Sequence, residues 1–255
     1  MSRVLDVRGM KLGAGIPKIC VPLTGRDVKT LLEEIHLAKA ASADMVEWRV
    51  DYFDASEDLE KVKEALREIR LSLGDIPLMF TFRTAEEGGE KAISPENYEK
   101  LNKEAAAANE IDFVDVELFR GEEICKNVIE SAHQSNTKVI VSSHEFQSTP
   151  DQDTILERLK KMRAIGADVP KIAVMPNTSA DVITLLAATD DYIQKYADCP
   201  VITMSMKWMG SVSRIAGEFF GSALTFGSAR RVSAPGQLAV DELRTVLKIL
   251  HGSNI

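Results

Sequence analysis

A chain of 255 residues is long enough for one large domain or two small ones. Its composition, 45% hydrophobic and 27% charged, is close to the globular average and excludes a disordered or fibrous chain. The formal net charge of −8 leaves no extended basic surface to follow a phosphate backbone, so we expect no nucleic-acid partner. An anionic ligand would need arginines placed locally against this overall charge.

Three cysteines, Cys20, Cys125 and Cys199, are far apart and form no Cys-x-x-Cys pattern with a histidine nearby. Neither a disulfide framework nor a metal site is therefore predicted, and a reducing cytoplasm suits the chain. Charges interrupt the first ten residues, and no hydrophobic run reaches the length needed to span a membrane. We expect a cytoplasmic protein with no signal peptide and no membrane partner.

Short hydrophobic runs alternate along the chain with segments of helical periodicity, after an N-terminal segment that predicts a hairpin around Gly9 and Gly13. The predicted strand and helix pairs are 18–24 and 27–41, 44–50 and 59–73, 77–83 and 98–108, 111–117 and 124–132, 137–143 and 155–165, 170–176 and 180–196, 200–206 and 212–220, and 222–226 and 238–250.

Eight alternating units of this kind predict parallel strands connected by crossover helices. Closed on themselves, they form an α/β (β/α)8 TIM barrel, and we expect the N-terminal hairpin to close its bottom. The alternative is an open doubly wound sheet, but no Gly-x-Gly-x-x-Gly follows the first strand. Because no flexible linker interrupts the pattern, residues 1–255 are predicted to form a single catalytic domain.

One lysine, Lys171, interrupts the hydrophobic run at 170–176, where two prolines bound a predicted buried strand. Lys171 could extend its ammonium to water from a strand end, with only its stem packed. Alternatively it is buried and reactive, because a desolvated amine favours the neutral form that attacks a carbonyl to give a Schiff base. Since Lys171 precedes most of its run, we expect it to lie one layer below the barrel rim.

Polar residues gather where the predicted strands run out into loops, which is the face that carries active sites in TIM barrels. These residues are Glu47, Arg49, Arg83, Asp115, Glu117, His144, Lys171 and Arg214. Asp115 and Glu117 could instead form a structural ion network, and Met204 and Met206, which share one strand face, are typical packing residues. The loop at 231–237 contains a Pro-Gly turn and is a candidate lid.

Together these side chains indicate carbonyl chemistry on a small carboxylate. The lysine could form an imine, the histidine could carry protons near neutral pH, and the arginines could hold an anion. One alternative is a lysine-dependent aldolase, which a phosphate site near Ser211 or Ser228 would favour. Another is a catalytically silent barrel that binds a small acid as a sensor or scaffold.

Several motifs then carry a specific resemblance that runs along essentially the whole chain. They are EWRVD at 47–51, FTFR at 80–83, EGG at 87–89, SH at 143–144, PKIAVMP at 170–176, MSM at 204–206, SR at 213–214 and SAPGQ at 233–237. With them the chain closely resembles the type I 3-dehydroquinate dehydratases, the Schiff-base dehydroquinases of the shikimate pathway of aromatic amino acid biosynthesis.

The resemblance implies dehydration of 3-dehydroquinate to 3-dehydroshikimate by a homodimer, with no metal and no organic cofactor. By position, Lys171 matches the Schiff-base lysine, His144 the general acid and base, Glu87 the carboxylate near that histidine, and Arg214 the anchor of the substrate carboxylate. The remaining matches are ring-binding and pocket or lid positions, namely Glu47, Arg49, Arg83, Met204, Met206, Phe226, Ser233 and Gln237. The chain departs from the pattern at Pro22, where some members have a serine.

Overall fold

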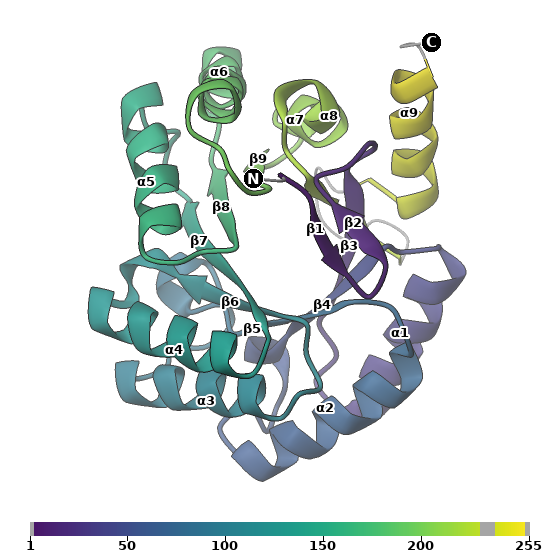
Figure 1. Cartoon of the computed structure of the whole chain (residues 1–255). Coiled ribbons are helices and arrows are strands. Elements are labelled where there is room, and N and C mark those ends of the chain that lie inside the picture. The colour runs from purple at the N-terminus through teal and green to yellow at the C-terminus, as the bar shows by residue number, and fades with distance from the viewer. Residues whose placement is uncertain (1–2, 230–237, 253–255) are drawn as a thin grey trace.

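A parallel barrel of eight strands forms the centre of the computed structural model, which describes residues 3–229 and 238–252 (Figure 1). The strands lie in the order β10-β3-β4-β5-β6-β7-β8-β9, and a parallel bridge between Val201 and Ser222 joins the two outer members. Their bounds are β3 Lys18–Leu23, β4 Met45–Arg49, β5 Leu78–Thr81, β6 Phe113–Glu117, β7 Lys138–Glu145, β8 Val169–Val174, β9 Ile202–Ser205 and β10 Leu224–Phe226. The predicted (β/α)8 barrel is confirmed.

Helices surround the barrel and follow the strands in sequence, as the alternating pattern predicts (Figure 1). They are α1 Val28–Ala40, α2 Leu59–Leu73, α3 Pro95–Ala107, α4 Glu122–Gln134, α5 Gln152–Ala164, α6 Ser179–Lys195, α7 Ser211–Ile215, α8 Gly217–Phe220 and α9 Val240–Gly252. Several begin at a carboxylate that accepts a hydrogen bond from the first turn, as Asp27 does from the Thr30 N–H and Asp151 from the Thr154 N–H.

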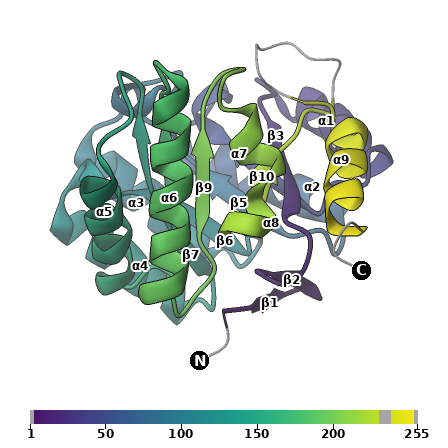
Figure 2. The same ribbon diagram turned by 90° about the horizontal axis from the view of Figure 1, so that it is seen from above.

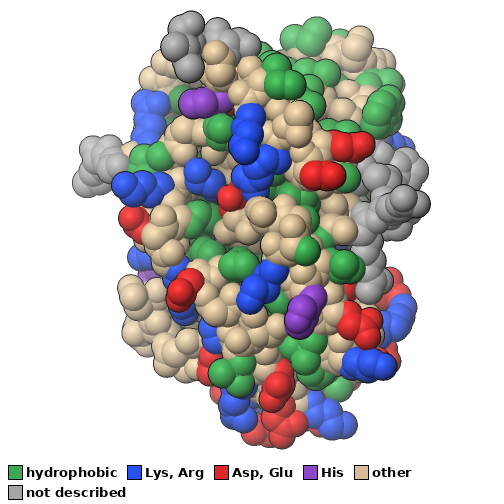
Figure 3. Space-filling view, turned by 90° about the vertical axis from the view of Figure 1, so that its right-hand side faces the viewer, with side chains coloured by type: hydrophobic (Ala, Val, Ile, Leu, Met, Phe, Trp, Pro, Cys, Tyr) green, Lys and Arg blue, Asp and Glu red, His purple; other side chains and the backbone are tan. Residues whose placement is uncertain are grey.

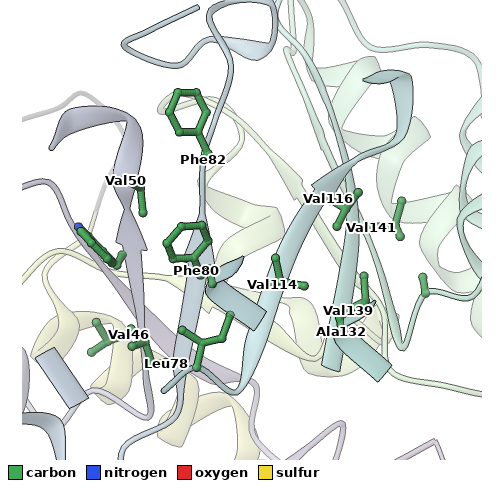
Figure 4. Packing of buried hydrophobic residues seen from close by; sticks show 14 of the residues in the cluster. Val46, Val50, Leu78, Phe80, Phe82, Val114, Val116, Ala132, Val139 and Val141 are labelled. Carbon is green, nitrogen blue, oxygen red and sulfur yellow. The ribbon is translucent and has the colours of Figure 1, made fainter. Parts of the chain in front are cut away.

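Strand residues alternate between the helix-facing side and the barrel interior, because successive side chains of a strand point to opposite faces. Figure 4 shows the helix-facing set, in which Val46, Phe80, Val114 and Val139 extend from neighbouring strands into one continuous core. The inward-facing residues are hydrophobic near the strand starts. They are Cys20, Met45, Met79, Phe113, Ile140, Val169, Ile202 and Leu224.

The N-terminal hairpin closes the bottom of the barrel, as predicted. Strands β1 Leu5–Val7 and β2 Met10–Leu12 pair antiparallel and immediately precede β3, so they lie at the amino ends of the barrel strands (Figure 2). Leu12 is fully buried and packs with Val7 into the inward-facing hydrophobic cluster. The opposite end, where the strands finish, is therefore the end left for a ligand.

Two details differ from the sequence prediction. The single helix predicted at 212–220 is wrong, because α7 and α8 are separate short helices that meet at Ala216. Strand β7 runs on to Glu145, so His144 lies within a strand and not in the following loop. The predicted lid at 231–237, with Ser233 and Gln237, falls outside the described residues.

Among residues 3–229 and 238–252, no helix is long and hydrophobic enough to cross a membrane. Within the same residues, the His, Cys, Asp and Glu side chains form no group of three suited to holding a metal ion. The three cysteines are buried and free.

Candidate active site

The register of β7 and β8 sets the relative heights of the two central residues. Lys171 lies opposite Ser142, and His144 lies opposite Ala173, two residues further along both strands. Lys171 is therefore one layer below His144, as the sequence predicts, and both face the interior. The small side chain of Ala173 leaves space above the lysine, where a bulkier residue would fill the barrel.

Lys171 is a buried amine held by carboxylates. It is 2% exposed, and its Nζ donates a hydrogen bond to Asp115 Oδ2 at 2.9 Å while lying 3.8 Å from Glu47 Oε1. The Phe226 ring covers it, with the ring centroid 5.1 Å from Nζ. A strand-end lysine that reaches water is thus the wrong interpretation, because the Lys171 side chain is buried.

A pocket of about 250 Å³ opens above Lys171 at the carboxyl ends of the strands. The predicted site residues that line it are Glu47, Arg49, Arg83, Glu87, His144, Lys171, Met204, Met206, Arg214 and Phe226. Pro22 also lines the pocket, so its departure from the family pattern falls directly in the site. Gly88 of the EGG motif lines it as well. The sequence prediction gave no role to Phe146 and Ala173, which also line the pocket and carry no charge that would have marked them.

Glu87 and His144 form a close pair at the pocket wall. Glu87 Oε2 lies 2.9 Å from His144 Nδ1 and also accepts the backbone N–H of His144 at 3.0 Å. Burial raises the pKa of Glu87 to about 8, helped by the charge of Glu117 and opposed by Arg83. Burial, with the charges of Arg83 and Lys171, holds the pKa of His144 well below its ordinary value. The imidazole is therefore uncharged at neutral pH and able to accept a proton, and its Nε2 is the nitrogen left for a substrate.

Arg83 and two carboxylates form a buried ion network beneath the pocket. The guanidinium donates to Asp115 Oδ1 at 2.7 Å and to Glu117 Oε1 at 2.9 Å, and all three side chains are almost fully buried. Burial alone would raise the pKa of Asp115, but Arg83 and Lys171 together hold it below its usual range. Asp115 therefore makes two contacts. It is part of the buried ion network with Arg83 that the sequence analysis considered, and it accepts the hydrogen bond from the Lys171 amine.

The three arginines of the site differ in whether their charge is already matched. Arg49 makes a two-point hydrogen bond to Asp51 at 2.8 and 2.7 Å, and Arg83 is held by its own carboxylates. Among the described residues no carboxylate pairs with Arg214, whose buried Nε has no partner. Of the arginines that the sequence analysis considered for holding an anion, Arg214 is the one without a carboxylate partner among the described residues. Asp51 stands in the EWRVD motif, but the sequence assigned it no function.

We expect Arg83→Met to lower the free energy of unfolding by about 3–5 kcal/mol, because it leaves Asp115 and Glu117 buried without their main counter-charge. Methionine preserves much of the stem volume, so the charge is the principal change. Urea unfolding followed by circular dichroism measures the effect.

Arg26→Met is the matched control, because Arg26 also contacts two carboxylates, Asp54 and Glu90, but is 58% exposed. Its loss should cost no more than about 1 kcal/mol. Equal effects of the two substitutions would show that the buried network contributes no more than a surface pair.

Comparison with known proteins extends this description. The family model for type I 3-dehydroquinase matches residues 19–254. A 3-dehydroquinate dehydratase of Clostridioides difficile is 50% identical over 253 residues, 99% of each chain. One from Listeria innocua is 52% identical over 251 residues, 98% of this chain and 99% of the relative. The solved type I 3-dehydroquinate dehydratase from Clostridium difficile with covalent modified comenic acid has a TM-score of 0.97 and 50% identity, covering 99% of this chain and 100% of that chain.

One pocket at the carboxyl ends of the strands brings together a buried lysine, an uncharged histidine and an arginine without a carboxylate partner among the described residues. Such a pocket is typical of a (β/α)8-barrel enzyme. The fold alone would fit many activities. The match along nearly the whole sequence is specific: the chain belongs to the type I 3-dehydroquinase family and is an enzyme of the hydro-lyase class.

Proposed function

We propose that this enzyme dehydrates 3-dehydroquinate to 3-dehydroshikimate through a Schiff base on Lys171. The observation that carries the proposal is the placement of the buried Lys171 amine and His144 on the same pocket, one layer apart. The names of the relatives support the substrate. The Clostridium difficile relative solved with covalent modified comenic acid supports covalent chemistry in this family.

The first step is attack of the Lys171 nitrogen, through its lone pair, on the substrate carbonyl, which forms a carbon–nitrogen bond and releases the carbonyl oxygen as water. Asp115 holds the amine beneath the pocket by its 2.9 Å hydrogen bond and balances the positive charge of the resulting iminium. The iminium withdraws electrons from the adjacent carbon and so acidifies its proton.

His144 then removes that proton, because its low pKa keeps the imidazole uncharged at neutral pH. The electron pair moves into an enamine, which expels the neighbouring hydroxyl, and His144 returns the proton so that the hydroxyl leaves as water. Glu87 orients the ring through Nδ1. Because the pKa of Glu87 is raised to about 8, it balances the charged form of the ring only in the fraction of molecules in which Glu87 is ionised. Hydrolysis of the imine frees the product and restores Lys171.

Arg214 binds the substrate carboxylate in this proposal, because it is the pocket arginine left without an acidic partner among the described residues. Glu47, Arg49 and Arg83 form polar walls around the ring. The charges of Arg49 and Arg83 are already balanced by carboxylates of the protein, and Glu47 lies 3.8 Å from the Lys171 amine, so these residues shape the pocket more than they attract an anion. Met204, Met206 and Phe226 provide the hydrophobic surface. Ser233 and Gln237 remain proposed lid residues.

We also propose that the chain acts as a homodimer, as the family resemblance implies, and that it is a single-domain protein of the cytoplasm, as the unbroken pattern of elements and the scattered cysteines indicate. Exposed hydrophobic side chains support an interface, since Trp208, Met209, Val212 and Phe219 are 47% to 69% exposed within one short segment. Figure 3 shows hydrophobic side chains gathering along one upper edge of the face that it draws. Free, buried cysteines fit a reducing compartment.

Borohydride reduction in the presence of 3-dehydroquinate tests the Schiff base, because it converts an imine into a stable amine. Peptide mass mapping should find the adduct on Lys171. Lys138, at the start of β7 and away from the pocket, is the internal control and should stay unmodified. An adduct elsewhere, or none at all, would contradict the proposal, and omission of the substrate should abolish labelling.

A further inference from the structure

Arg214 depends on its backbone for its position more than the other two pocket arginines do. Carboxylates hold the guanidinium groups of Arg49 and Arg83 at 2.7–2.9 Å, whereas Arg214 has no such partner among the described residues. Without a carboxylate to hold it, the guanidinium of Arg214 lies where the backbone of α7 places its Cα and where its stem packs. What fixes α7, which carries Arg214, therefore matters to the pocket.

The helix itself provides little of that rigidity. α7 has only five residues, and helices this short are unstable without outside contacts. Its Val212 is 52% exposed, so hydrophobic burial contributes little on that side. Ile215 packs against the core at the end of α7, so the start of the helix is the part that polar contacts hold against the barrel.

Ser213 makes those contacts through one buried hydroxyl. Its Oγ accepts the backbone N–H of Ser205 at 2.9 Å and donates to the carbonyl of Gly210 at 2.7 Å. Ser205 is the last residue of β9, between the pocket residues Met204 and Met206. The hydroxyl thus connects the start of α7 to the strand end that borders the pocket.

Gly210 completes the attachment because its backbone lies close to the backbone of Ser205 and Met206. A Cβ on this residue would lie 2.2 Å from the Ser205 carbonyl oxygen and 2.5 Å from that of Met206. These atoms are backbone and cannot move aside as a flexible side chain would, so only glycine permits this packing. Ser213 and Gly210 therefore hold α7 against the same turn of chain from two sides.

We propose that Ser213 is a positioning residue for Arg214: its hydroxyl seats α7 on the end of β9 so that the guanidinium meets the substrate carboxylate. This inference rests on the proposed function, which gives Arg214 the carboxylate. Loss of the hydroxyl leaves the Ser205 N–H without its partner and lets the helix shift. Displacements of about 1 Å in a binding group reduce activity by up to about 100-fold.

A double-mutant cycle with purified full-length enzyme tests the inference. Ser213→Ala should raise the KM for 3-dehydroquinate by about 10- to 100-fold while kcat changes less, because the lost contact is one of binding. In an Arg214→Ala background, the same Ser213→Ala change should alter kcat/KM by less than about twofold, because the group it positions is gone. Circular dichroism confirms that each variant is folded.

Ser211→Ala is the matched control, because Ser211 lies in the same short helix and its hydroxyl also donates to a backbone carbonyl, that of Trp208, but at the exposed side. It should leave KM unchanged. Ser213→Cys leaves a weaker donor and acceptor at the same position, so it should raise KM in the same direction by a smaller factor, and it serves if Ser213→Ala does not fold.

Equal losses from Ser213→Ala with and without Arg214 would overturn the inference, because they would assign Ser213 a structural role independent of the arginine. An unchanged KM in the folded Ser213→Ala enzyme would also overturn it. A wrong assignment of Arg214 in the proposed function would give another result: Arg214→Ala alone would then leave the KM for 3-dehydroquinate unaltered.

Discussion

Lys171→Met should lower kcat/KM for 3-dehydroquinate by about a million-fold, a loss comparable to removal of a covalent nucleophile in a hydrolase. The reason is that every later step depends on the iminium, and within the described residues Lys171 is the only lysine that lines the pocket. Appearance of the conjugated product, followed by its ultraviolet absorbance, measures the rate. Borohydride labelling should disappear in the same variant.

Lys171→Arg tests whether Lys171 acts as a nucleophile or only as a positive charge. An arginine retains a cation that can pair with Asp115. A guanidinium does not lose its proton at neutral pH, however, and so forms no imine. We therefore expect the same loss of activity as for methionine. Retention of more than about one hundredth of the activity by Lys171→Arg would refute covalent catalysis and leave Lys171 as an electrostatic group.

His144→Ala should lower kcat by about 10²- to 10⁴-fold, the usual contribution of a general acid and base. The imine should still form, because the Lys171 amine and its carboxylate neighbours are unchanged. Borohydride should therefore trap the variant on Lys171 with substrate present, although turnover has nearly stopped. Stopped turnover with an intact imine would place His144 after Schiff-base formation.

His133→Ala is the control for this experiment. His133 lies 2.9 Å from Asp168, the same separation as between His144 and Glu87, but it is exposed on α4 and does not line the pocket. Its replacement should leave kcat unchanged. Normal turnover in His144→Ala would remove the histidine from its proposed role, and a lost imine would show that it acts earlier.

Local sequence patterns were enough to predict most of the fold. Each strand carries hydrophobic residues at a period of two or as a continuous run, and each long helix carries them at helical spacing, so the order of elements follows from local chemistry. Local patterns did not predict the break between α7 and α8 at Ala216. Residues 212–220 carry hydrophobic residues at helical spacing, but α7 ends at Ile215 and α8 begins at Gly217, where the structure starts a separate helix.

The site could be predicted in part for a similar reason. The period of two puts Glu47 and Arg49 on one face, and the carboxyl ends of parallel strands meet at one end of the barrel, so most pocket residues could be named. Phe146 could not be, because an isolated aromatic after a strand is normally packing. Asp51 follows its strand and looks like any loop carboxylate until the fold places it against Arg49.

By itself, the sequence of this protein determined the barrel, the hairpin beneath it, and the presence of Lys171 and His144 on neighbouring strands. It determined them because strand periodicity and chain order are local properties. Only the tertiary structure decided which charges meet across the barrel. Lys171 reaches Asp115 two strands away, and Arg214 alone among the pocket arginines lacks a carboxylate in the described residues. Such pairings depend on strand register and on separations near 3 Å, which residue order does not encode locally.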